Sequence, residues 1–514
     1  WPGGWWRLRD IVERQKISAW AVLDIAARNK ETVLWNAYLK AKRQTERGAQ
    51  SEPAAYVIPT AQHDPLTAVK MINRLLVQGV EVLQARKDAT TNGATYPAGT
   101  YVVSLAQPKM GLIRYLLGRT FYPDNEWTRS RDGSPMRPYD MATDTMFEFM
   151  GVRVDPVDEP VKGDLQKLTG PVPTVGKVGQ GGTAYAFDGR LNDSFRALNM
   201  LLEKGVAVRR VDRSSDPGVR GGDFVVGPGS EAVLASAAKE TGVDFTALRA
   251  DVKQGTHDMK RLRLGMYQRY RGGNMDEGWT RWLLEQYGFP YTSLFDAEIK
   301  KGDLNAKYDV IILPDDSTAA ITGERPAGGA AGGPGGGGGF GGQAESAPPE
   351  YRSGIGRDGT DALKAFVEKG GTLVTLGGAS NFAIERFSLP IRDVVGGRPT
   401  KEFFCPGSTL HAIFDNTHPL AYGMPAEGLL LFWNSQAYEI APTDANDKYD
   451  IVVRFPERDL LQSGWLIGEN LLFKKAALIS AKVGNGRIVL FGFRPQPRAT
   501  THGTFKLLFN ALVQ

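Results

Sequence analysis

The stretch Leu75-Leu76-Val77-Gln78-Gly79-Val80-Glu81-Val82 decides the fold, because it ends a helical pattern on glycine and then enters an apolar strand. The same order returns at Leu201–Val208 and again at Leu283–Phe289. Glycine suits the position after a helix, where a positive φ is favoured that costs other residues more. The repeat predicts three strand–helix–strand units, the building block of parallel sheets with right-handed crossovers.

A short apolar strand precedes the helix of each unit, at Tyr56–Pro59, Tyr185–Phe187 and Leu264–Tyr267. The first two units also share a tail, in which a turn leads into a strand at Tyr96–Val103 and at Arg220–Val226. A helix follows each tail, starting near residue 109 and near residue 230. We therefore expect an α/β protein with two similar lobes, each built on a parallel sheet.

The third unit opens a longer α/β domain. Tyr308–Pro314 and Thr372–Leu376 are predicted as buried strands, with a helix over Asp361–Glu368 between them. Gly484-Asn485-Gly486 predicts a hairpin turn, and a closing helix is expected over Thr504–Leu512. This pattern is typical of a three-layer, flavodoxin-like domain.

The N-terminal segment from Leu8 to about Thr45 is helical by its 3.6-residue spacing of apolar residues. An amphipathic helix of this length needs a surface to lie on. The chain opens on Trp1-Pro2-Gly3-Gly4-Trp5-Trp6, with no initiator Met and no signal peptide. We expect it to be a piece of a longer protein.

Four segments are predicted from these patterns in the 514 residues. They are an amphipathic helical segment (1–50), a first α/β lobe (51–160), a second lobe (161–257) and the α/β domain (258–514). The last contains a glycine-rich insertion at about 323–350, where 11 of the 17 residues from Pro326 to Gly342 are glycine. Such a composition is typical of a flexible surface loop.

Composition excludes some functions. Lys+Arg 62 against Asp+Glu 57 leaves +5, too little over this length for a general electrostatic nucleic-acid binder. The single cysteine, Cys405, excludes a disulfide framework and multi-cysteine metal sites. No apolar run of about 18 residues exists, so no membrane span is predicted.

Metal and nucleophile patterns are weak. The candidate metal ligands are His63-Asp64, His257-Asp258 and His411 with His418, but Asp64-Pro65 reads as the start of a helix. We expect structural roles for these residues and assign no metal ligand. After the strand Thr372–Leu376 stands Gly377-Gly378-Ala379-Ser380 rather than a G-x-S-x-G elbow, so Ser380 is expected to cap a helix. No catalytic residue is assigned.

A ligand-binding candidate follows the last buried strand. Arg494, Arg498 and His502 stand between that strand and the closing helix, where anions bind in open α/β sheets. Together they could clamp a carboxylate or a phosphate, and Asp315 and Asp316 at another strand end could face the same crevice. The alternative is that the arginines bind backbone carbonyls or a neighbouring lobe and that a threonine caps the helix.

Several motifs resemble the region that follows the catalytic domain of large bacterial zinc carboxypeptidase-like proteins. The resemblance covers essentially the whole chain, and the last third also resembles class I glutamine-amidotransferase-like domains. The motifs that carry it are the Trp1–Trp6 opening, Tyr56–Pro59, Tyr96–Val103 with Ala106-Gln107-Pro108, Pro138-Tyr139-Asp140, Met150-Gly151-Val152 and the ending Gly486–Phe505.

The resemblance implies a carboxypeptidase A-type zinc peptidase domain upstream, with zinc in that domain and no cofactor in this chain. No H-x-x-E motif occurs here, and the cysteine expected after Leu376 is missing. We therefore expect a non-catalytic accessory region of a secreted or periplasmic protein. Its partners would be the upstream peptidase domain and a peptide or cell-surface substrate. The alternatives are an independent ligand-binding or hydrolytic enzyme using the C-terminal crevice, and a structural module that forms homo-oligomers.

Overall fold

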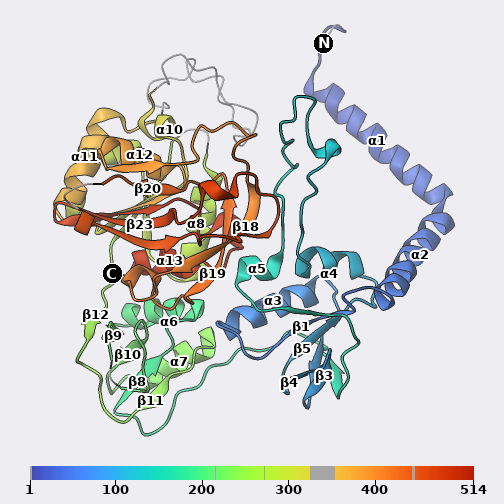
Figure 1. The fold of residues 1–514 in the computed structure, drawn as a ribbon, viewed down its shortest axis with the longest axis horizontal. Helices are drawn as coiled ribbons and strands as arrows, with labels where there is room; N and C mark the ends of the chain where they lie inside the picture. The colour runs from blue at the N-terminus through green and yellow to red at the C-terminus, as the bar shows by residue number, and fades with distance from the viewer. Residues whose placement is uncertain (1–2, 215, 271–272, 325–352, 443–445, 514) are drawn as a thin grey trace. The chain divides into compact units, whose positions relative to one another are not determined.

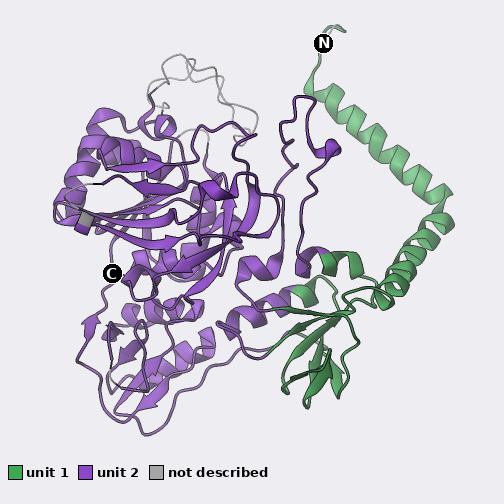
Figure 2. Ribbon diagram, viewed as in Figure 1, with its two compact units in different colours: residues 1–59, 75–114, 154–170 green, residues 60–74, 115–153, 171–514 purple. Residues whose placement is uncertain are grey.

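Two compact units divide the chain. The computed structural model describes residues 3–214, 216–270, 273–324, 353–442 and 446–513. Unit 1 comprises residues 1–59, 75–114 and 154–170, and unit 2 comprises 60–74, 115–153 and 171–514 (Figure 2). The predicted glycine-rich insertion lies outside the described residues except for positions 323 and 324.

Unit 1 holds two long helices and a small sheet. The helix predicted from Leu8 to about Thr45 is two helices, because Asn29 leaves helical geometry at φ −111° and ψ 22°. Helices α3 (Pro65–Val77) and α4 (Met110–Leu117) are each divided between the units. The other elements are α1 (Leu8–Arg28), α2 (Lys30–Ala49), β1 (Ala55–Ile58), β2 (Leu83–Ala85), β3 (Ala89–Thr91), β4 (Ala94–Tyr96), β5 (Tyr101–Ser104), β6 (Asp155–Val157) and β7 (Leu165–Lys167).

The first part of unit 2 forms a second small sheet (Figure 1). Its elements are β8 (Ala184–Phe187), α6 (Asn192–Glu203), β9 (Val208–Val211), β10 (Phe224–Val226), α7 (Glu231–Thr241), β11 (Thr246–Leu248) and β12 (Thr256–Asp258). Its strand order is β11-β8-β10-β9-β12, while the sheet of unit 1 has the order β6-β1-β5-β2-β7. The two orders correspond strand for strand.

The prediction of parallel sheets is wrong for both small sheets. In unit 1, β5 lies between β1 and β2 and pairs antiparallel with each of them. In unit 2, β10 lies between β8 and β9 in the same way. A strand–helix–strand pattern fixes the direction of its two strands but not their adjacency, so a third strand can enter between them. All hydrogen-bonded neighbours then become antiparallel.

The rest of unit 2 is built around a mixed sheet. Its helices and strands are α5 (Met146–Met150), β13 (Leu264–Tyr267), α8 (Met275–Gln286), β14 (Tyr291–Leu294), α9 (Asp296–Lys301), β15 (Val310–Leu313), α10 (Thr318–Thr322), α11 (Gly356–Glu368), β16 (Thr372–Leu376), α12 (Ala379–Arg386), β17 (Ile391–Asp393), β18 (Pro406–Phe414), β19 (Glu427–Trp433), β20 (Tyr438–Ile440), β21 (Tyr449–Arg454), β22 (Leu461–Ser463), β23 (Ala476–Val483), β24 (Gly486–Phe491) and α13 (Phe505–Ala511). The short 3₁₀ turns are η1 (Glu126–Thr128), η2 (Leu304–Ala306), η5 (Pro419–Ala421), η6 (Asn446–Lys448), η7 (Glu469–Leu471) and η8 (Pro497–Ala499).

The mixed sheet has a parallel half and an antiparallel half. Neighbouring strands in the order β14-β13-β15-β16-β24 are parallel, as predicted for this part of the chain. From β24 the order continues β23-β21-β18-β19 with antiparallel pairs, and β23 and β24 form the predicted hairpin. The chain is therefore a mixed α/β protein with several sheets.

Helices cover both faces of the parallel half, which explains why its strands are apolar throughout. On β15, Ile311 packs in the core that includes α9, α10, α11 and α12, while Ile312 packs in the core that includes α8 and α13. Side chains along a strand alternate between faces, so a continuous apolar strand needs both covers. This arrangement places the start of α13 beside the carboxyl end of β24.

The repeated glycines adopt the conformation that the sequence predicts. Gly79, Gly205 and Gly288 follow α3, α6 and α8 and have φ values of 75°, 73° and 70°. A side chain at such a φ is disfavoured, so glycine ends each helix at the point where the next strand begins.

Candidate functional site

Arg494 lies in a buried ion cluster at the carboxyl end of the parallel strands. Its Nη1 donates to Asp276 Oδ2 at 3.0 Å and lies 3.6 Å from Asp315 Oδ2. Its Nη2 donates to the carbonyl oxygen of Trp433 at 2.8 Å, and the guanidinium lies over the Trp433 ring. Burial raises the pKa of Asp276 to about 6, and Arg494 opposes this shift. The structure thus brings Arg494 and Asp315 together, as predicted.

Arg498 and Asp316 bind other groups. Arg498 donates two hydrogen bonds to Asp140, at 2.7 and 2.6 Å, and its guanidinium lies 4.9 Å from the centroid of the Trp433 ring. Asp316 pairs with Arg269 at 3.3 Å, and burial raises its pKa to about 6. Both arginines therefore contact Trp433 but bind different carboxylates.

His502 lies away from both arginines. Its Nδ1 lies 2.8 Å from the carbonyl oxygen of Thr500, and its ring packs on Phe505. Burial lowers the pKa of His502 to about 3, so the ring is neutral at physiological pH. It lines a cavity whose walls do not include the arginines or aspartates predicted with it. The five predicted residues therefore do not converge on one cavity.

Ser380 is not a helix cap, contrary to the prediction. Helix α12 begins at Ala379, so Ser380 lies within it, and the Ser380 hydroxyl is buried among the carbonyl oxygens of Thr375 and Phe491. Cys405 is buried, and burial raises the pKa of its thiol to about 12. Neither group is presented as a nucleophile.

The histidine–acid pairs considered as metal ligands have structural partners. His257 pairs with Asp212 at 2.8 Å, and His418 caps η5 by accepting from the Leu420 amide. Among the described residues no group of three or more His, Cys, Asp or Glu is arranged to hold a metal ion.

A cavity of about 290 Å³ is the candidate functional site of unit 2. We call it the α13 cavity, because Lys506 of α13 and the residues just before α13 form one of its walls. Its volume lies near the lower end of the roughly 300–1,000 Å³ typical of small-ligand sites. The lining residues are His63, Asp64, Phe147, Glu148, Met150, Gly151, Val152, Arg153, Asn192, Phe414, Met424, Pro425, Glu427, Gly428, Leu429, His502, Gly503 and Lys506.

Asp64 holds the starts of two helices at one side of the cavity. Its Oδ1 accepts from the Thr67 amide at 3.0 Å, which is the helix cap that the sequence predicts for α3. Its Oδ2 accepts from the Thr67 hydroxyl at 2.8 Å and from the Asn192 amide, at the first residue of α6, at 2.9 Å. One buried carboxylate thus satisfies backbone donors of two helices that lie far apart in the sequence.

Lys506 is the unusual residue of the cavity. It is buried on α13, and within the described residues its single hydrogen bond goes to the neutral amide oxygen of Asn192, at 3.3 Å. Burial lowers the pKa of Lys506, while Asp64 raises it. An ammonium group has three donors, so two donors of Lys506 are not used by the described residues. This arrangement suits an anionic partner.

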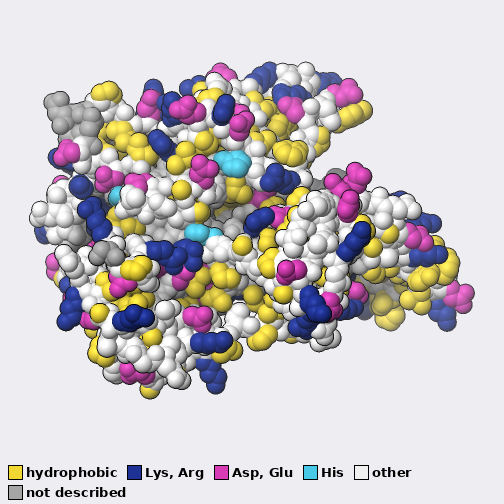
Figure 3. Space-filling view, turned by 60° about the horizontal axis from the view of Figure 1, so that its bottom comes forward, with side chains coloured by type: hydrophobic (Ala, Val, Ile, Leu, Met, Phe, Trp, Pro, Cys, Tyr) yellow, Lys and Arg dark blue, Asp and Glu magenta, His cyan; other side chains and the backbone are white. Residues whose placement is uncertain are grey.

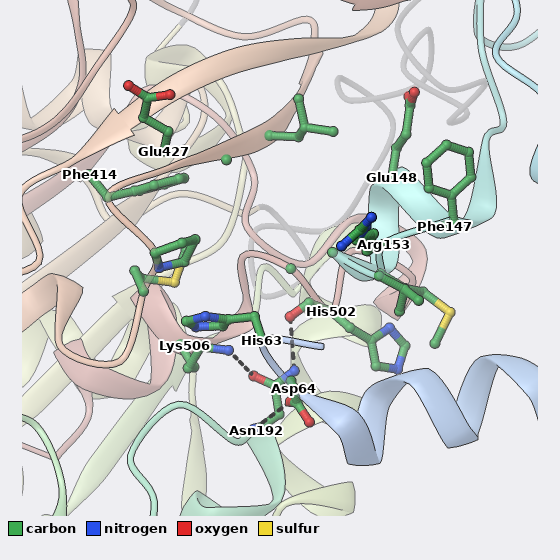
Figure 4. A pocket seen from close by; sticks show the side chains of 18 residues that line it. His63, Asp64, Phe147, Glu148, Arg153, Asn192, Phe414, Glu427, His502 and Lys506 are labelled. Carbon is green, nitrogen blue, oxygen red and sulfur yellow. Dashed lines mark hydrogen bonds between the residues drawn. The ribbon is translucent and has the colours of Figure 1, made fainter. Parts of the chain in front are cut away.

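His63 lies beside Lys506. Its Nε2 is 2.7 Å from the carbonyl oxygen of Gly423, which makes that nitrogen the donor. Burial and the charge of Lys506 lower the pKa of His63. Figure 4 shows His63, Lys506, Asp64 and Asn192 gathered on one side of the cavity.

The glutamates of the lining are directed elsewhere. Figure 4 shows the carboxylates of Glu148 and Glu427 pointing away from Lys506. Glu148 accepts hydrogen bonds from Thr409 and Ser463, each at 2.5 Å, and from Gln462 at 3.1 Å. Its hydrogen-bonding capacity is thus used on β18 and β22, and the rest of the wall between Phe147 and Phe414 is mainly apolar.

The surface charge is mixed. On the face drawn in Figure 3, acidic and basic side chains of the described residues are interspersed with hydrophobic ones. The α13 cavity therefore differs from its surroundings in holding a buried cation beside apolar side chains, rather than in a broad surface field.

Comparisons with known proteins extend no further than the fold. No protein-family model matches the chain, and no curated protein matches it. Among solved structures it is similar to a ThuA-like protein from Bacteroides uniformis, at 14% identity and a TM-score of 0.28, over 52% of this chain and 94% of that one. It is also similar to a cytoplasmic protein from Salmonella typhimurium, at 14% identity and a TM-score of 0.30, over 49% and 97% of the two chains.

A third similar structure is described as a GMP synthase protein from Thermoplasma acidophilum, at 8% identity and a TM-score of 0.28, over 49% and 94% of the two chains. Identities and scores at this level carry no argument about activity. None of these three proteins is described as a carboxypeptidase, and that relationship stays a prediction.

Proposed function

We propose that this chain is a non-catalytic binding region of a zinc carboxypeptidase-like protein, and that the α13 cavity binds a small carboxylate with an apolar side chain. Such a ligand is the carboxyl end of a peptide or the amino acid released from it. The observation that carries the proposal is Lys506, a buried cation whose only hydrogen bond among the described residues is to a neutral amide.

The chemistry of the cavity supports this ligand class. A carboxylate would give Lys506 the counter-charge that the described residues do not place in contact with it, and charge-assisted hydrogen bonds are the stronger kind. Phe147, Met150, Phe414 and Met424 line the same cavity and offer apolar surface to a side chain. A few polar groups within a mainly apolar cavity are typical of small-molecule sites.

The frame of the proposal comes from the sequence resemblance. We further propose that the last third is a glutamine-amidotransferase-like domain in a silent form, since Ser380 is buried against strand carbonyls where such domains place their nucleophile. The export expected from the same resemblance is part of this proposal.

The experiment is a calorimetric comparison of two ligands, N-acetylphenylalanine and N-acetylphenylalaninamide, which differ in the carboxylate alone. We expect the acid to bind about 10- to 100-fold more tightly, because a hydrogen bond to a charged group contributes roughly 1.5–3 kcal/mol. The variant Lys506→Met should remove this preference. Lys482→Met, at an exposed position of β23, is the matched control and should keep it.

Equal affinity for acid and amide, or no binding of either, would contradict the proposal. Retained preference in the Lys506→Met variant would move the site away from the α13 cavity.

A further inference from the structure

The helical arm of unit 1, which we define as residues 5–49, leaves its apolar side chains exposed. Helix α1 has no buried residue over its 21 positions, and in α2 the single buried residue is Gly48. Trp20 and Leu23 in the middle of α1 are 65% and 62% exposed. Exposed apolar areas of this extent commonly mark an interaction surface.

The exposed residues follow a helical period. In α1 they recur at spacings of three, four and seven residues, which places them along one stripe of the helix. The stripe consists of Leu8, Ile11, Val12, Ala19, Val22, Leu23 and Ala26. Within the described residues no helix has the length and apolar content to cross a membrane, so this stripe is that of a helix lying along a surface.

The arm also holds the net charge of the protein. It contains ten Lys and Arg residues and five Asp and Glu residues, whereas the whole chain contains 62 and 57. The formal net charge of +5 therefore equals that of the arm alone, and the remainder of the chain is balanced. A positively charged segment with an apolar stripe matches the chemistry of an anionic lipid surface.

Tryptophans strengthen this match. Four of the ten tryptophans of the chain lie in the arm, at positions 5, 6, 20 and 35. Arg7 lies 5.9 Å from the ring centroid of Trp5, and Arg14 lies 4.9 Å from that of Trp6. Tryptophan and arginine both favour the boundary between headgroups and hydrocarbon.

One end of the arm is fixed to the sheet region of unit 1. A Cβ at Gly48 would lie 1.8 Å from the carbonyl oxygen of Leu105, so glycine permits this close approach. Gln44 Oε1 accepts from the Gly111 amide at 2.9 Å. Figure 2 shows the two helices leading away from this attachment within unit 1.

We infer that the arm binds the surface of an anionic lipid bilayer, independently of any ligand in the α13 cavity. A second copy of the chain fits less well, because pairing two arms would bring together two segments of +5. The bilayer supplies both an apolar layer for the stripe and negative charge for the basic residues.

The test is flotation of the full chain with vesicles of phosphatidylcholine alone or with one-third phosphatidylglycerol. We expect at least about 10-fold greater binding to the anionic vesicles at low salt, weakened at high salt. Tryptophan emission should shift to the blue on binding. Leu23→Glu should abolish binding, while Val77→Glu, at a position 82% exposed on α3, should leave it unchanged.

Three outcomes would overturn the inference. They are equal binding to neutral and anionic vesicles, no binding to either, and a concentration-dependent dimer that is broken by Leu23→Glu in the absence of lipid. Circular dichroism of each variant shows whether its helices are retained.

Discussion

Helices α3 and α6 follow corresponding strands of two sheets with the same strand order, yet their starts are stabilised differently. Asp64 precedes α3 and accepts hydrogen bonds from both helices. Counting back from Gly79 and Gly205, the residue that corresponds to Asp64 is Arg190, which pairs with Asp188 instead. The comparison teaches that a residue with the sequence signature of a local cap can also be a long-range contact.

A second difference lies in the strands that follow these helices. Arg210 on β9 corresponds to Gln84 on β2, by the same alignment on the two glycines. Arg210 is buried over the rings of Phe224 and Phe195, and burial lowers its pKa to about 9. Its Nη2 donates to Asn510 of α13 at 3.0 Å. The second sheet is thus tied to the last helix of unit 2 through a cation.

Asp64→Ala should have the largest effect on this comparison. It leaves the buried amides of Thr67 and Asn192 without their acceptor, and each unsatisfied group costs roughly 1–3 kcal/mol. We expect urea unfolding to show a loss of about 3 kcal/mol. Asp64→Asn keeps one acceptor and should lose about half as much. A loss below about 1 kcal/mol for Asp64→Ala would show that water replaces the carboxylate.

Arg210→Gln should have an intermediate effect. The substitution gives β9 the residue that β2 carries, removes the contacts with two rings and leaves Asn510 Oδ1 without this donor. We expect a loss of about 2 kcal/mol in thermal or urea unfolding, from the cavity and the lost cation–π contacts. The reverse exchange, Gln84→Arg at a half-buried position, should change stability by about 0.5 kcal/mol or less. Similar losses for both would remove the distinction between the two strands.

Lys70→Met should have the smallest effect, and one that depends on pH. Lys70 pairs with the buried Asp193 of α6 at 2.7 Å but is itself partly exposed, so we expect about 1 kcal/mol at pH 7. Burial raises the pKa of Asp193, so the folded state keeps that proton to higher pH than the unfolded chain does. Stability therefore falls as pH rises through this interval, and losing Lys70 enlarges the fall.

The loss in Lys70→Met should accordingly shrink toward about pH 4, where the carboxyl is protonated in both states. Urea unfolding at several pH values measures this change. A loss that is constant with pH would indicate a packing effect of the Lys70 stem rather than its charge.

Much of the fold was predictable because it depends on local patterns. The strand–helix–strand order at Tyr56 and Tyr185, the parallel strands from Leu264 onward and the glycine ends of the helices follow from periodicity and backbone preference. The pairing within the two small sheets did not follow, because β5 and β10 enter between strands that their sequence places before them. Adjacency is a tertiary property that strand patterns do not encode.

The candidate site was predicted in part. His502 was identified from its place before the last helix, and Asp64 was recognised as a cap, but their meeting in one cavity joins segments with no local sequence relation. Lys506 was missed, although a signal existed. It is the single charged residue in Phe505-Lys506-Leu507-Leu508-Phe509, the apolar core of α13. A charge in a buried helix needs a partner, which makes such a lysine worth testing.

The contact between Asn192 and the carbonyl oxygen of His502 joins residues 310 positions apart, and the contact with Asp64 spans a further 128. During synthesis these segments leave the ribosome at widely separated times. The starts of α3 and α6 can meet early, but the cavity gains its cation only after α13 has been made. Until then its apolar wall is open, and this interval is when the chain is most exposed to misassembly.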